Sequence, residues 1–191
     1  LKKISSEEFK ISSKLFLLYK EERTSVIKPL AIDSQEGTGS MGDDTALAVM
    51  SKMHRQIYDY FRQQFAQVTN PPIDSLRESS VMSLETCFGP ELNVFEESPE
   101  HAKRLVISSP VLSHKKLQSI LINPYFKCDE IKLVYKKDES LKGALKLLQK
   151  KAVNSIKEGN TIIHLDESLP DKNSIPINSL LAVGCVHQKL V

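Results

Sequence analysis

Three cysteines and five histidines are the residues of this chain best suited to nucleophilic or metal chemistry. The cysteines, Cys87, Cys128 and Cys185, are far apart and form no C-x-x-C pair, so their spacing predicts neither a disulfide framework nor a zinc site. We interpret them as buried or half-buried thiols in a reducing compartment. Cys87 with His101 or His114 could in principle supply a nucleophile and its base, but nothing in the sequence brings them together. His164 lies in the apolar run 161–165, where we expect a core residue with its hydrogen bonds satisfied.

A glycine string, Gly37-x-Gly39-x-x-Gly42, matches the dinucleotide-binding fingerprint in its letters. That fingerprint requires a strand before it and a helix after it, so that free backbone N–H groups meet a pyrophosphate. The glycines are instead followed by Asp43 and Asp44, which would repel phosphate. We therefore expect a structural loop, with the two aspartates capping the next segment, and no nucleotide or metal site.

Length and composition limit the class of protein. The 191 residues are 40% hydrophobic and 26% charged, which is typical of one globular domain. A net charge of +2 gives no electrostatic reason to expect nucleic acid or an anionic membrane as a partner. No apolar run has the length of a membrane span. Because the first residue is Leu and the last helix has no stop signal, we expect an excised fragment.

The elements of the first half are predicted from short apolar runs and breakers. Residues 1–36 indicate helical turns and loops, and the apolar segment 46–50 is expected to be buried. Aromatic residues at helical spacing predict a helix over 54–67, which Pro71 and Pro72 end. A second helix is expected to begin after Asp74, whose carboxylate can cap its first turn.

The second half has a more regular pattern. Strands are predicted at 104–107, 131–135 and 161–165. Helices are predicted from Ser113, over 140–157 with Gly159 as its C-terminal cap, and from Asn178. Strand, helix and strand at this spacing predict parallel pairing with a right-handed crossover. The expected fold is α/β, a mostly parallel sheet flanked by helices, with a helix- and loop-rich N-terminal part.

Several segments resemble the central region of glutamate synthase large subunits. The similarity is dense up to about residue 112 and sparse over 113–175. The most similar segments are Gly39-Ser40-Met41-Gly42-Asp43-Asp44-Thr45, Tyr58-Asp59-Tyr60-Phe61-Arg62-Gln63-Gln64-Phe65, Val68-Thr69-Asn70-Pro71-Pro72-Ile73-Asp74 and Ser109-Pro110-Val111-Leu112. Ser75 stands where that family usually has Pro.

The resemblance implies a domain organisation and a set of partners. Residues 1–36 would connect to a preceding glutaminase domain, and 37–191 would be the central α/β domain, truncated at its C-terminal end. In that family, ammonia released from glutamine travels through an internal tunnel to an FMN domain, where it is used with 2-oxoglutarate to make glutamate. The parent enzyme would be cytoplasmic and carry FMN and a 3Fe-4S cluster, with NADPH or ferredoxin as donor. It could include a small electron-donating subunit. This segment itself would bind no cofactor.

The same resemblance places tunnel-lining residues at Met41, Thr69 and Asn70. A Met side chain is flexible and apolar, and Thr and Asn can offer transient hydrogen bonds to neutral ammonia. Two alternatives stay open. One is a scaffold domain without a transport role, and the other is a small independent hydrolase that uses Cys87.

Overall fold

The computed structural model describes residues 5–33, 37, 48–52, 54–61, 73–109, 111–168, 171 and 173–191. The chain separates into two compact units, Leu1–Pro71 and Pro72–Val191, and each is described by itself. In the part of the chain that the structure describes, no helix is long and apolar enough to cross a membrane.

The first unit consists of short helical segments, as expected for residues 1–36. Its elements are α1 (Ser6–Leu15), α2 (Lys20–Glu22), the π-helical turns η1 (Arg23–Ile27) and η2 (Pro29–Asp33), and the 3₁₀ turn η3 (Ile57–Tyr60). A capping box starts α1, because Ser5 Oγ accepts from the Glu8 amide and the Glu8 carboxylate accepts from the Ser5 amide. The Gln56 side-chain amide donates to the carbonyls of Phe16 and Leu17, at 3.1 and 3.3 Å, and so joins η3 to the end of α1.

Two of the predictions made from the sequence for this unit are wrong in its described residues. Residues 54–61 contain only the 3₁₀ turn and not the start of an α-helix, while 62–67 lie outside the described residues. The Asp59 carboxylate accepts the Gln56 amide at 3.1 Å, and such a local side-chain bond competes with helix propagation. Val49 and Met50, expected to be buried, are 89% and 93% exposed.

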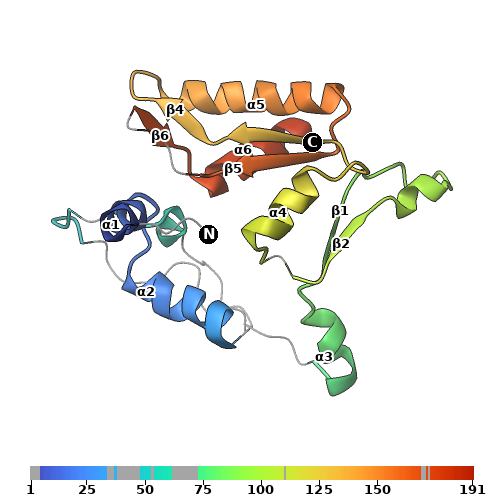
Figure 1. Cartoon of the computed structure of the whole chain (residues 1–191), viewed down its shortest axis with the longest axis horizontal. Coiled ribbons are helices and arrows are strands. Elements are labelled where there is room, and N and C mark those ends of the chain that lie inside the picture. Colours follow the sequence, from blue (N-terminus) through green and yellow to red (C-terminus); the bar gives the residue numbers. More distant parts are fainter. Residues whose placement is uncertain are drawn as a thin grey trace. The chain divides into compact units, whose positions relative to one another are not determined.

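The second unit contains the hydrophobic core. Its central elements are β3 (Cys128–Lys132), β4 (Val134–Lys136), α5 (Leu141–Lys157), β5 (Ile162–Asp166), β6 (Ser174–Pro176) and α6 (Ser179–Leu190). β3 and β5 form a parallel pair and β4 and β6 an antiparallel pair, with α5 and α6 packed on the strands (Figure 1). The α/β class and the parallel pairing are confirmed, and a mostly parallel sheet stays a prediction.

Leu133 is the point at which the pairing changes. Its amide donates to the Asp166 carbonyl and its carbonyl accepts from the Ile177 amide, each at 2.8 Å. The segment predicted as one strand, 131–135, is therefore divided between two ladders. Leu133 is fully buried, so burial of its side chain and hydrogen bonding of its backbone coincide at the centre of the core.

The two long helices form as the sequence predicts. Ser140 Oγ accepts from the Gly143 amide at 3.1 Å at the start of α5, and Asn178 caps α6. α5 and α6 bury a shared set of small and medium side chains against the sheet: Ala144, Leu148, Ala152, Ala182 and Val186. The Gln149 side chain donates to the Cys185 carbonyl at 3.1 Å and so joins the two helices.

The remaining elements lie between residues 73 and 122. They are α3 (Ser75–Val81), β1 (Thr86–Phe88), the 3₁₀ turn η4 (Pro99–Ala102), β2 (Leu105–Ile107) and α4 (His114–Leu121). Asp74 and Ser113 cap α3 and α4 as predicted. β1 pairs with β2 in antiparallel fashion, and the chain between them begins at Gly89, whose φ of 147° suits glycine.

Candidate functional site

The face of the β3–β5 pair that points away from the core carries four charged or titratable side chains. Alternation along each strand turns Ile131 and Leu165 toward α5 and α6 and turns their neighbours to the opposite face. Register places two cross-strand pairs there, Glu130 opposite His164 and Lys132 opposite Asp166. We call these four residues the polar ladder.

The first pair of the polar ladder is in direct contact. His164 Nδ1 lies 3.2 Å from Glu130 Oε2, and the two side chains are 22% and 45% exposed. His164 is therefore a paired and partly exposed residue rather than the core histidine expected from its apolar neighbours. The apolar run predicted a strand correctly but not the face on which this side chain lies.

The second pair is organised around Asp166. Partial burial is the largest single influence and acts to raise the pKa of this carboxyl group, whereas hydrogen bonds from the Ser168 hydroxyl and amide act to lower it. The positive charges of His164 and Lys132 act in the same direction, so the pKa of Asp166 is lowered from its ordinary value of 3.8. The Ser168 hydroxyl donates to Asp166 Oδ2 at 2.7 Å, which fixes the carboxylate at the end of β5.

The next residue, Glu167, acts on α6. Its Oε1 accepts from the Ser179 amide at 3.3 Å, while Asn178 Oδ1 accepts from the Leu180 amide at 3.0 Å. Two amides of the first turn are thus occupied by side chains of the chain itself. A carboxylate at this position also complements the positive end of the helix.

The polar ladder places opposite charges side by side on an open face. Parallel sheets are usually covered on both faces, so this face is suited to lie against another layer or a water-filled space. The sequence analysis did not predict the polar ladder, although the alternation of residues 128–132 and 162–166 is the pattern from which it could have been predicted.

The residues singled out by the sequence analysis are not those of the polar ladder. Met41, Thr69 and Asn70 lie outside the described residues, as do Gly39, Gly42 and the two following aspartates. Gly37 is described, and a Cβ on it would come within 2.9 Å of the Val26 Cα. This glycine is thus required for close backbone packing, while residues 38–42 of the predicted loop lie outside the described residues.

Cys87 is exposed in β1, opposite Val106. His101 Nε2 lies 2.8 Å from the Glu96 carbonyl oxygen, and His114 is the first residue of α4. All three residues belong to the described segments 73–109 and 111–168, and no hydrogen bond joins the thiol to either imidazole there.

The other thiols are partly buried. Burial raises the pKa of Cys128, whose Sγ lies 3.7 Å from the Ile120 carbonyl oxygen, so this thiol is held in its unreactive form. Cys185 packs against the Leu145 carbonyl at 3.7 Å. Among the described residues, no group of three or more His, Cys, Asp or Glu side chains is arranged to hold a metal.

Comparison with known proteins agrees with the resemblance found in the sequence. Residues 12–191 match the family described as the glutamate synthase central domain. This chain belongs to that family.

Relatives of this glutamate synthase central domain include proteins of fungi and plants. The chain is 36% identical over 178 residues to "Glutamate synthase [NADH]" of Saccharomyces cerevisiae. It is 39% and 41% identical, over 179 residues each, to the chloroplastic ferredoxin-dependent glutamate synthases of Spinacia oleracea and Oryza sativa subsp. japonica. Each alignment covers 90% of this chain but only 8%, 11% and 11% of the relative, respectively. This central domain therefore spans about a tenth of the length of the relatives it matches.

Proposed function

We propose that this central domain links the glutaminase and FMN domains of a glutamate synthase and lines the internal path of ammonia between them. In this proposal residues 1–36 connect to the glutaminase domain and 37–191 form the central domain. The parent enzyme is an oxidoreductase that makes glutamate from glutamine and 2-oxoglutarate. The observation that carries the proposal is the family match over 12–191 within relatives about ten times as long.

The path itself is assigned to Met41, Thr69 and Asn70. These side chains offer a flexible apolar group and weak hydrogen-bonding groups, which let neutral ammonia pass without holding it as an ion. The polar ladder supports placing the path elsewhere than the open face of β3–β5, because Glu130 and Asp166 would retain ammonium there. The two prolines that follow Asn70 restrict the backbone next to it.

The parent enzyme supplies the redox chemistry. We assign FMN and a 3Fe-4S cluster to its other domains. For the cluster, which is held by cysteine thiolates, the reason is that the three cysteines of this chain lie on separate elements: Cys87 in β1, Cys128 in β3 and Cys185 in α6. The electron donor was expected to be NADPH or ferredoxin. The names of the relatives include NADH and ferredoxin, so we propose a pyridine nucleotide or ferredoxin as donor. A cytoplasmic location stays a prediction, and the plant relatives are chloroplastic by name.

The test is a bulky substitution, Thr69→Trp, in the full-length enzyme. A blocked path is expected to reduce the rate of glutamine-dependent glutamate synthesis by at least about tenfold. A tenfold change corresponds to roughly 1.4 kcal/mol of activation free energy. Synthesis from added ammonia should be retained, and ammonia should be released to the solvent. The matched control is Asn154→Trp, which enlarges a small polar residue on the exposed side of α5.

Full coupling of glutamine hydrolysis to synthesis in Thr69→Trp would contradict the proposal. That result would favour the scaffold alternative. Loss of both the glutamine-dependent and the ammonia-dependent reactions, with a normal control, would indicate damage to the FMN site rather than a blocked path.

A further inference from the structure

Helix α1 is followed by a strained turn. Leu17 has a φ of 54° and is the only residue other than glycine with a positive φ in the part of the chain that the structure describes. The Leu18 amide donates to the Ser13 carbonyl at 2.8 Å and the Leu17 amide to the Lys14 carbonyl at 3.3 Å, the two bonds of a Schellman motif. That motif usually has glycine at the position of Leu17, because a side chain raises the free energy of the left-handed conformation. Another contact must therefore hold Leu17 in place.

The residues that lead into η3 supply this contact. The Gln56 side-chain amide donates to the carbonyls of Phe16 and Leu17, which follow the last turn of α1 and have no α-helical partner. In the opposite direction, the Tyr19 hydroxyl donates to the His54 carbonyl at 3.2 Å. Each segment thus binds the backbone of the other through one side chain. We call Leu17, Tyr19, His54 and Gln56 the latch.

The same junction carries a second cost besides the φ of Leu17. Glu22 Oε2, in α2, is buried and has no hydrogen-bond partner among the described residues. Burial raises the pKa of Tyr58 in η3, and the charge of the Glu22 carboxylate acts in the same direction, so Glu22 lies close to η3. A buried carboxylate oxygen without a donor destabilises the state in which it is buried. Separation of η3 from α2 would hydrate this oxygen and let Leu17 relax.

We propose that the latch is a conformational device with two states. The closed state is the one described here, and in the open state Gln56 leaves its two carbonyls and Leu17 leaves the left-handed conformation. The gain from a side-chain hydrogen bond and the cost of a left-handed residue other than glycine are similar in size, so the two states differ little in free energy. Small changes at the junction can therefore shift their populations.

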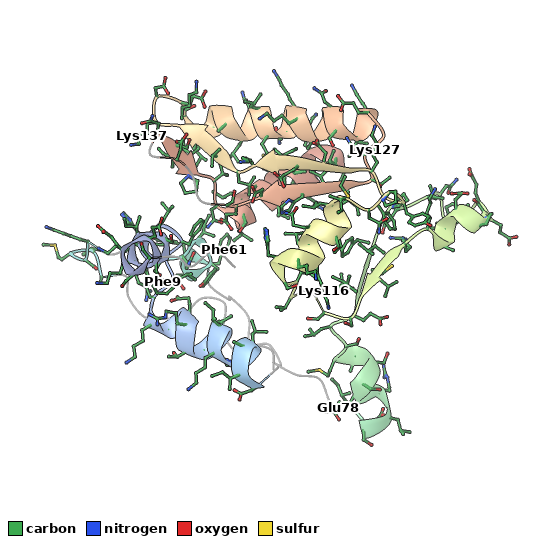
Figure 2. All side chains as sticks on the ribbon, in the orientation of Figure 1. Phe9, Phe61, Glu78, Lys116, Lys127 and Lys137 are labelled. Atoms are coloured by element: carbon green, nitrogen blue, oxygen red, sulfur yellow. The ribbon has the colours of Figure 1, made fainter. Side chains whose placement is uncertain are left out.

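The latch lies where the chain enters the central domain. Phe9 on α1 and Phe61 directly after η3, both labelled in Figure 2, mark the two parts that it joins. The family match begins at residue 12, within α1, so Leu17 is close to the boundary of the domain. Residues at the ends of elements are the ones that absorb large backbone changes at hinges. Opening of the latch would thus change the direction of α1 relative to η3, which goes beyond the proposed function because it does not concern the path of ammonia.

Hydrogen exchange in the full-length enzyme, read at single amides by mass spectrometry, tests the latch. Opening breaks the bond from the Leu18 amide to Ser13, so the exchange rate of this amide, corrected for neighbouring side chains, reports the open population. Gln56→Met keeps a side chain of similar length without the donor and is expected to speed this exchange about tenfold. Tyr19→Phe removes the second link and should speed it about threefold. Leu17→Gly relieves the strain and should slow it about fivefold.

Two controls separate opening of the latch from other effects. Gln118→Met makes the same substitution at an exposed position of α4 and should leave the Leu18 amide unchanged. The Phe9 amide, which donates to the Ser5 carbonyl at 2.9 Å in the first turn of α1, reports general loss of stability. Its exchange should stay the same in each latch variant.

Three outcomes would overturn the latch. They are an unchanged Leu18 amide in Gln56→Met, equal acceleration at Phe9 and Leu18, and faster exchange of Leu18 in Leu17→Gly. Since Leu17→Gly removes no hydrogen bond of the latch, it decides the question even where Gln56→Met fails to fold. Exchange at these amides does not depend on ammonia transfer, so its result is distinguishable from that of Thr69→Trp.

Discussion

His164 Nδ1 and Glu130 Oε2 lie 3.2 Å apart across the parallel pair β3–β5, on the face that α5 and α6 leave open. The contact joins two strands that are separated in sequence by the whole of α5. It therefore reports directly on the correct pairing of these strands.

We expect the Glu130–His164 contact to contribute little to stability, because partly exposed ion pairs are worth about 0.2–1 kcal/mol. A double-mutant cycle with Glu130→Gln and His164→Gln, followed by urea unfolding, measures the coupling. The same cycle on Lys103 and Glu100, whose side chains are 56% and 62% exposed, should give a smaller value. A coupling energy well above 1 kcal/mol at the ladder would contradict the exposure described here.

The lowered pKa of Asp166 predicts that the free energy of unfolding decreases in acid. Its folded-state pKa is lowered, so the stabilisation is fully present above the ordinary value of 3.8 and is lost as the pH falls through the lower folded value. Asp166→Asn should unfold more easily than the parent chain near pH 6, and the difference should shrink toward pH 2. Urea midpoints measured across this range check the direction. Ser168→Ala removes the hydroxyl donor and should give a smaller effect of the same sign. A difference that grows as the pH falls would contradict this assignment.

Neighbouring leucines on α5 should respond very differently to truncation. Leu148 is 3% exposed in the core, so Leu148→Ala is expected to cost about 2–5 kcal/mol of unfolding free energy. Leu147 is 51% exposed, and Leu147→Ala should change stability by less than about 1 kcal/mol. Thermal and urea unfolding of the two variants give the comparison. Equal losses would mean that α5 packs with a different face.

Two glycines offer a matched test of backbone conformation. Gly159 follows α5 with φ at 83°, a region that side chains avoid, so Gly159→Ala should destabilise the chain by about 1 kcal/mol. Gly184 lies within α6, with nothing within 4 Å of an added Cβ. Gly184→Ala should therefore stabilise the helix by up to about 1 kcal/mol. Opposite signs in denaturant unfolding are the expected result, and a stabilising Gly159→Ala would contradict the cap.

The sequence by itself determined the elements whose signals are local. Ser113, Ser140 and Asn178 precede their helices as capping residues, and the apolar stripe of residues 140–157 selected the buried face of α5. Each of these depends on side chains within a few residues of the backbone groups that they satisfy, so neighbouring letters suffice. The family could also be recognised from short segments, because these segments carry the residue types of the family in the same order.

Only the tertiary structure decided where strands change partners and which polar side chains meet. Leu133 divides a predicted strand because its amide and carbonyl bond to Asp166 and Ile177, residues more than thirty positions away. The polar ladder likewise exists only through the register of β3 on β5. Local composition cannot specify such contacts, since they depend on which distant backbone groups arrive opposite one another after the core has packed.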